Sequence, residues 1–155
     1  MNKDTDIEMT IGIDPDSKKH GISIYINKEL VSLKSFSLIE FYHYLNVQIQ
    51  TYNITTHIED VAAVSAAFRA RDTQGSLSKK LKIAQSIGMC KQAQIEIERV
   101  CDVYGVPVVK HKISSMWKKD KAQFEKVTGW TGRSNEDTRS GAWFGWLGCT
   151  RKCKC

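Results

Sequence analysis

Three carboxylates, far apart in the sequence, stand where a folded chain could bring them to one metal site. Asp14 directly follows the apolar run 11–13, Glu59 ends a second apolar segment, and Asp137 opens a late segment with helical spacing. Mg²⁺ prefers oxygen ligands in near-octahedral geometry. Two such ions about 3.5–4 Å apart can activate water and stabilise the leaving oxygen in phosphodiester cleavage. The acids therefore predict metal-dependent hydrolysis if the fold brings them together.

Each acid also has a simpler explanation. Asp14 stands before a proline, and such pairs often begin turns. Glu59 is followed by another acid and could be a solvated strand end. Ser134 and Asp137 have the spacing of a capping box, and acids are favoured at a helix N-terminus. Only the joint arrangement of the three acids favours a metal site over these local uses.

The segments around these acids predict an α/β fold. Alternating apolar residues predict strands over 9–14 and 21–27, and a third over 30–36. Ser37 and Glu40 predict a capping box at the start of a helix. The whole pattern indicates a mixed five-stranded sheet flanked by helices. Further strands are expected to end near 59 and to cover 106–109, and helices are expected over 37–50, 77–104, 115–128 and 135–147.

Length and composition limit the possible classes of protein. The 155 residues predict one domain over 1–148, followed by a basic, cysteine-containing tail over 149–155 that we expect to be disordered. The sequence has no apolar run of about 18 residues, so it predicts no membrane span. The N-terminus does not resemble a secretory signal, and the cysteines suit a reducing cytoplasm. The net charge of +6 favours a polyanionic partner.

The cysteines near the C-terminus suggest a second kind of metal site. Cys149, Cys153 and Cys155 cluster within seven residues. Structural zinc takes four ligands, and no histidine stands close in the sequence to complete such a set. A disordered tail is therefore the favoured interpretation.

The acidic segments resemble those of the RuvC-like Holliday-junction resolvases of the RNase H-like superfamily, and phage-type members in particular. The stretch IGIDPDSKKHGISIY is similar to the first two strands of that family, with Asp14 in the first catalytic position. HIEDV places the second carboxylate at Glu59, and NEDTRSGAW resembles the terminal acidic helix. LKIAQSIGMCKQ resembles the start of the long helix, where Gly88 is expected to permit close packing. The similarity spans residues 9–147.

The resemblance implies a crossover junction endodeoxyribonuclease acting in DNA recombination and repair. Asp14, Glu59 and Asp137 would hold two Mg²⁺ or Mn²⁺ ions, and Lys121, in its Asp-Lys-Ala-Gln setting, would lie near the scissile phosphate. Such enzymes leave 5′ phosphates and cut as homodimers. The family commonly ends with two acids three residues apart, whereas here Ser140, or Ser134 in the other register, takes one place. Glu136 would supply the missing ligand.

Basic segments predict the DNA contacts. Six lysines stand between residues 110 and 126, among them Lys118, Lys119 and Lys121. Trp117 in this run could stack on a base, although a partly buried position is the favoured interpretation. Phe68, beside Arg69 and Arg71, could act as a wedge at a junction or equally belong to the core.

Three functions fit the sequence. The first is a resolvase for four-way or branched DNA in the cytoplasm of a bacterium or a phage-infected cell. The second is a branched-DNA-binding module without cleavage, and the third is an RNase H-like nuclease with another substrate. Metal-dependent nicking separates the second from the others, and a junction compared with a hybrid duplex separates the first from the third.

Overall fold

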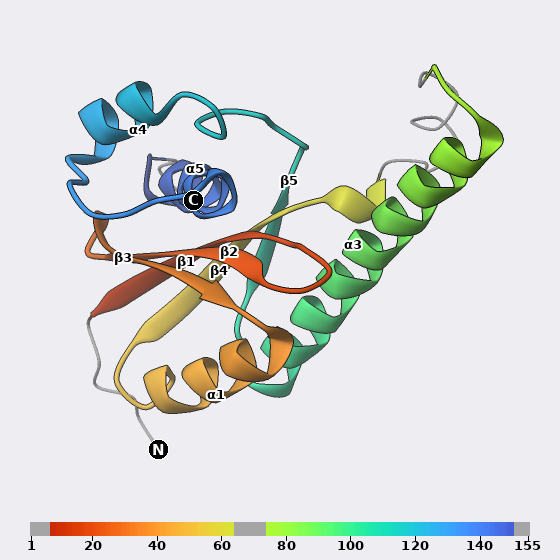
Figure 1. The fold of residues 1–155 in the computed structure, drawn as a ribbon. Helices are drawn as coiled ribbons and strands as arrows, with labels where there is room; N and C mark the ends of the chain where they lie inside the picture. The colour runs from red at the N-terminus through yellow and green to blue at the C-terminus, as the bar shows by residue number, and fades with distance from the viewer. Residues whose placement is uncertain (1–6, 64–73, 151–155) are drawn as a thin grey trace.

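A mixed five-stranded sheet forms the centre of the protein in a computed structural model that describes residues 7–63 and 74–150 (Figure 1). The strands lie in the order β3-β2-β1-β4-β5. The pairs β1–β2 and β2–β3 are antiparallel, whereas β1–β4 and β4–β5 are parallel. The predicted sheet is therefore confirmed. The strands are β1 (Glu8–Asp14), β2 (His20–Ile26), β3 (Glu29–Phe36), β4 (Asn53–Glu59) and β5 (Val108–His111).

Helices cover both faces of this sheet. The α1 and α3 helices lie on one face, and α4 and α5 lie on the other (Figure 1). The N-terminal half of α3 projects beyond the sheet, as Figure 1 shows. Ser37 and Glu40 form the predicted capping box of α1. The helical elements are α1 (Leu38–Gln48), the short η1 (Val61–Ala63), α3 (Leu77–Val103), α4 (Lys121–Thr128) and α5 (Glu136–Thr150).

The two-residue period of the strands divides the core between the two faces. Ile11 and Ile13 of β1 and Ile58 of β4 are fully buried in the apolar cluster that also contains α1 and α3 residues. Their neighbours Asp14 and Glu59 therefore point to the opposite face, which α5 covers. The sheet thus presents both acids to the side on which Asp137 begins its helix.

Glycines let α5 approach the sheet closely. A Cβ atom at Gly12 of β1 would overlap the Gly141 carbonyl oxygen, and one at Gly21 of β2 would overlap the backbone of Asp137. Ser23 Oγ donates to the Gly141 carbonyl at 2.9 Å. Because Gly21 is the strand partner of Asp14, this packing fixes the first turn of α5 beside the end of β1.

The segment before α4 corrects one prediction. A helix was expected over 115–128, but α4 begins only at Lys121, with the Asp120 side chain accepting from the backbone N–H of Gln123 at 2.9 Å. Trp117 has a φ of 63°, in the left-handed region, where a right-handed helix cannot continue. The carboxylate cap and this backbone turn together shorten the predicted helix.

Three smaller differences concern the last strand, the end of the last helix and one glycine. The last strand occupies 108–111 instead of 106–109, because the Val106 N–H donates to the Cys101 carbonyl at the end of α3. Cys149 was expected to open the tail, but it lies half-buried in the last turn of α5. A Cβ at Gly88 would meet nothing within 4 Å, so the expected close helix packing does not occur there among the described residues. No described helix is long and apolar enough to cross a membrane.

Candidate active site

Asp14 and Glu59 lie side by side at the carboxyl ends of two parallel strands. The residues before them, Ile13 and Ile58, are register partners in the β1–β4 ladder. Asp14 is only 5% exposed and Glu59 only 4%. Two adjacent, nearly buried carboxylates repel each other strongly unless a cation or a proton separates their charges. A positively charged group is therefore stabilising at this edge of the sheet.

Lys118 supplies part of this positive charge. Its Nζ lies 3.1 Å from Oδ2 of Asp14, and its side chain is 31% exposed. Burial by itself lowers the pKa of Lys118, but the charges of Asp14 and Glu59 outweigh burial, and its pKa is raised. The ammonium group therefore stays charged and neutralises one of the two carboxylates.

The pKa of Glu59 is raised by its surroundings. Burial raises the pKa of Glu59 to about 7, and the negative charge of Asp14 adds to the rise. Lys118 and the Ser114 N–H, which donates to Oε1 at 3.2 Å, act in the opposite direction. A carboxyl group with such a pKa exchanges its proton easily near neutral pH, and a divalent cation would displace that proton.

Asp137 lies at the start of α5, exposed to solvent, on the α5 side of the same strand end. Partial burial raises the pKa of Asp137, and the negative charges of Asp14 and Asp16 raise it further. The alternative that Asp137 caps its helix is wrong. Asn135 Oδ1 accepts from the Thr138 N–H at 2.8 Å, and Thr138 Oγ1 accepts from the Asn135 N–H at 2.9 Å.

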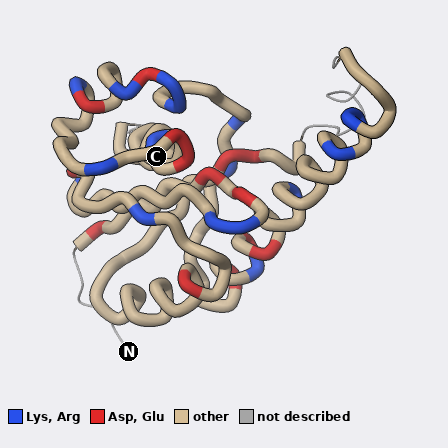
Figure 2. The backbone as a smooth tube through the Cα atoms, viewed as in Figure 1, with Lys and Arg blue, Asp and Glu red and all other residues tan. Residues whose placement is uncertain are grey.

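Figure 2 shows acidic segments near the start of α5 and the ends of β1 and β4, with basic segments on the neighbouring loops and around α4. We call Asp14, Glu59 and Asp137 the acidic site. Glu136 is exposed next to Asp137, and its charge raises the pKa of Asp137. The start of α5 thus places Asp137 on the side of the sheet to which Asp14 and Glu59 point, with Glu136 beside it, and a shared metal site stays a prediction.

Other predicted residues have different positions. Lys121 Nζ forms an exposed ion pair with Glu125 at 3.5 Å, so in this structure Lys118, and not Lys121, contacts the acidic site. Lys119 is exposed. Trp117 is 2% exposed and packs among Phe124 and other aromatic rings, which excludes base stacking and confirms the interpretation as a buried residue. Phe68, Arg69, Arg71, Cys153 and Cys155 lie outside the described residues.

The two serines that could replace a fourth acid differ in environment. Ser140 is fully buried, and among the described residues its Oγ has no hydrogen-bond partner. Ser134 Oγ accepts from Arg139 Nη1 at 3.3 Å. Neither hydroxyl contacts a carboxylate of the acidic site in the described structure. The expected replacement of the fourth acid by a serine ligand stays a prediction.

The acidic site suits a hard divalent cation by its chemistry. Within the described ranges, no three His, Cys, Asp or Glu side chains are grouped closely enough to hold a metal as they stand. The site nevertheless offers carboxylate oxygens only, and the one cation that an ion pair places against Asp14 Oδ2 in the described chain is Lys118. Oxygen donors with uncompensated negative charge are the ligands that Mg²⁺ and Mn²⁺ take. The donor set therefore fits Mg²⁺ much better than zinc.

Comparison with known proteins bears on the fold. No protein-family model matches the chain, and no curated protein matches it in sequence. The chain is similar to T. thermophilus RuvC in complex with a Holliday junction substrate, at a TM-score of 0.58, 11% identity and 90% coverage of both chains. A Thermus thermophilus RuvC structure has a TM-score of 0.49 at 12% identity, covering 91% of this chain and 93% of its own. The chain thus has a RuvC-like fold of the RNase H-like kind.

Proposed function

We propose that this protein is a metal-dependent endonuclease that cuts four-way or other branched DNA junctions. One observation carries the proposal: two nearly buried carboxylates, Asp14 and Glu59, end adjacent strands of a RuvC-like sheet and are only partly neutralised by Lys118. A purely structural core would gain by replacing such acids with apolar residues, because unpaired buried charge destabilises a fold. The arrangement is therefore best explained by a ligand that carries positive charge.

Asp14, Glu59 and Asp137 would hold Mg²⁺ or Mn²⁺, with Glu136 as an outer ligand. The metal would supply an activated water and stabilise the departing 3′ oxygen, so that the products carry 5′ phosphates. Lys118 would exchange its contact with Asp14 for one with the scissile phosphate, since the metal then neutralises the carboxylates. Lys119 and Lys121, which are exposed, would bind neighbouring phosphates.

Two copies of the chain would act together on a junction. The projecting part of α3 exposes apolar side chains, including Leu77 at 73% and Leu81 at 61%, which an interface would cover. A two-fold dimer presents two acidic sites to two equivalent strands. The expected setting is the cytoplasm of a bacterium or a phage-infected cell, and a phage-type origin stays a prediction from the sequence.

Three labelled substrates test the proposal: a four-way DNA junction, an RNA–DNA hybrid, and a linear duplex of the same sequence. With Mg²⁺, the wild type should nick the junction symmetrically, and EDTA should stop it. Asp14→Asn should abolish nicking and keep junction binding. Glu8→Gln, which removes an exposed acid at the opposite end of the same strand, is the matched control and should be as active as the wild type.

The second candidate is a module that binds branched DNA without cutting it. The full burial of Ser140 and the Lys118–Asp14 ion pair favour it, because the family's fourth acid is missing and a cation already contacts the site. Tight junction binding without nicking in either Mg²⁺ or Mn²⁺ would support this candidate. Preferential cutting of the hybrid would instead support a nuclease with another substrate.

A further inference from the structure

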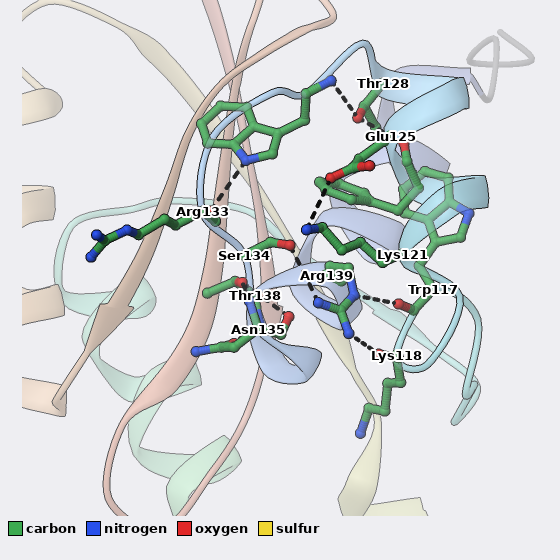
Figure 3. A network of polar contacts seen from close by, with 12 residues as sticks. Trp117, Lys118, Lys121, Glu125, Thr128, Arg133, Ser134, Asn135, Thr138 and Arg139 are labelled. Atoms are coloured by element: carbon green, nitrogen blue, oxygen red, sulfur yellow. Dashed lines mark hydrogen bonds and ion pairs between the residues drawn. The ribbon is translucent and has the colours of Figure 1, made fainter.

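Arg139 connects the first turns of α5 to the backbone of the loop that carries Lys118. It is only 8% exposed. Its Nε donates to the Trp117 carbonyl at 2.9 Å, its Nη2 donates to the Lys118 carbonyl, and its Nη1 donates to Ser134 Oγ at 3.3 Å (Figure 3). All three nitrogen atoms of the guanidinium group therefore donate hydrogen bonds, two to the loop and one to the residue Ser134 that precedes α5.

This is an unfavourable place for a cation. Arg139 is the fourth residue of α5, and the partial positive charge at a helix N-terminus repels cations. No ion pair in the described part of the chain involves Arg139, so its acceptors are carbonyl and hydroxyl oxygens. A buried charge without a carboxylate partner is costly. The cost of burying Arg139 must be offset by other interactions, and the hydrogen bonds to the loop carbonyls are those interactions.

The loop that Arg139 binds has an unusual backbone. Trp117 adopts a φ of 63°, which bulky residues rarely adopt. Its indole is fixed by edge-to-face contact with Phe124, at 5.6 Å between ring centroids, and with Trp143, at 5.2 Å. Two successive carbonyls bound to one planar guanidinium then fix the orientation of the peptide planes on both sides of Lys118. From this fixed backbone, Lys118 Nζ reaches Asp14 at 3.1 Å.

We propose that Arg139 is a positioning residue that holds the 117–118 backbone so that the Lys118 amine points into the acidic site. Its effect on DNA cleavage rests on the proposed nuclease function, whereas its effect on the loop does not. Lysine could not replace it fully, because a single ammonium group cannot donate in plane to both carbonyls and to Ser134.

Hydrogen exchange measured by mass spectrometry tests the effect on the loop without DNA or metal. In Arg139→Gln, amides of the 112–120 segment should exchange at least tenfold faster, whereas amides near the C-terminus of α3 should keep their rates. The Lys118 N–H, which donates to the Ser115 carbonyl at 3.2 Å in the wild type, should lose protection. Arg139→Lys should be intermediate, and it replaces the Gln variant if that variant fails to fold.

Asn135→Ala is the matched control, because it removes the cap of the same helix without touching the loop. Its faster exchange should be confined to the start of α5. An unchanged 112–120 segment in Arg139→Gln, or an equal increase in all segments, would overturn the proposal, since the latter means that Arg139 contributes only to global stability.

A double-mutant cycle tests the effect on cleavage. If Arg139 acts through Lys118, then Arg139→Gln should slow single-turnover nicking at least tenfold in the wild type but less than twofold in Lys118→Ala. Junction affinity should change less than twofold between each Arg139→Gln variant and its parent. Equal losses in both backgrounds would overturn the positioning role. If the wild type nicks no substrate, the proposed function fails, and the exchange experiment still decides the role of Arg139.

Discussion

The metal-free protein should lose stability as the pH rises from about 4.5 to about 7. Burial, with the charge of Asp14, raises the pKa of Glu59 from its ordinary 4.5 to about 7 in the folded protein. The folded state therefore holds this proton more tightly than the unfolded state does. Its contribution to stability is fully present below pH 4.5 and is lost as the pH rises through the folded pKa. Asp137, whose pKa is also raised, acts in the same direction.

The size of the effect follows from the same values. A rise in pKa from 4.5 to about 7 corresponds to about 3 kcal/mol of unfolding free energy, at 1.36 kcal/mol per pH unit. Because the effective dielectric constant near a protein surface is high, the electrostatic part of this effect is reduced, and a loss of about 1–3 kcal/mol is expected. His20 acts in the opposite direction, because burial lowers its pKa. Its contribution is present at high pH and is lost as the pH falls.

Denaturant unfolding in EDTA at several pH values between 4 and 8 measures this loss, and Glu59→Gln isolates the contribution of Glu59. The variant keeps His20 but has no titrating group at position 59, so the difference between wild type and variant should grow with pH up to about 7. At pH 7.5 the variant should be the more stable protein. Mg²⁺ should then stabilise the wild type and leave Glu59→Gln nearly unchanged. A constant difference across this range would refute the placement of Glu59 beside Asp14.

Four further outcomes are expected. Asp14→Asn should raise the unfolding free energy in EDTA while Mg²⁺ no longer stabilises the protein; a normal Mg²⁺ response would remove Asp14 from the site. Gly21→Ala should cost about 1–3 kcal/mol, because its Cβ would overlap the backbone of Asp137; unchanged thermal unfolding would contradict this packing. Ser140→Ala should stabilise the fold by about 1 kcal/mol by removing an unpaired buried hydroxyl, whereas Ser140→Asp should destabilise it unless Mg²⁺ is present; equal effects of the two substitutions in calorimetry would contradict its burial. Leu81→Glu should shift sedimentation from dimer to monomer if the projecting part of α3 forms the interface.

The fold was predictable because local and long-range patterns agree. Alternating isoleucines define the strands, and they also decide which strand face carries Asp14 and Glu59. The Ser37 cap marks the first helix without ambiguity. Even the neighbouring strand ends follow from the alternation of strands and helices, because the carboxyl ends of parallel strands meet at one edge of the sheet.

The surroundings of the acids were harder to predict. Lys118 and Lys121 stand in one basic run, and nothing in their local sequence says that the first reaches Asp14 while the second pairs with Glu125. That difference depends on the left-handed backbone conformation of Trp117. A tryptophan in the sequence does not predict this conformation. The capping patterns at the start of α5 also overlap, since Ser134 with Asp137 and Asn135 with Thr138 have the same spacing. Geometry selects the second pair.

The helix α5 carries one acid of the acidic site and also the arginine that binds the loop of Lys118. Asp137 and Arg139 stand two residues apart in α5: one is presented at the end of β1, and the other holds the Lys118 loop. The position of α5 along the sheet is set by the backbone contacts at Gly12 and Gly21, so both groups depend on the same packing. A shift of the helix along the sheet would therefore move an acid away from its neighbours and release their counter-charge at once. Substitutions at the two sheet glycines, Gly12 and Gly21, should therefore disturb the acidic site although neither residue carries a side chain that could bind a metal.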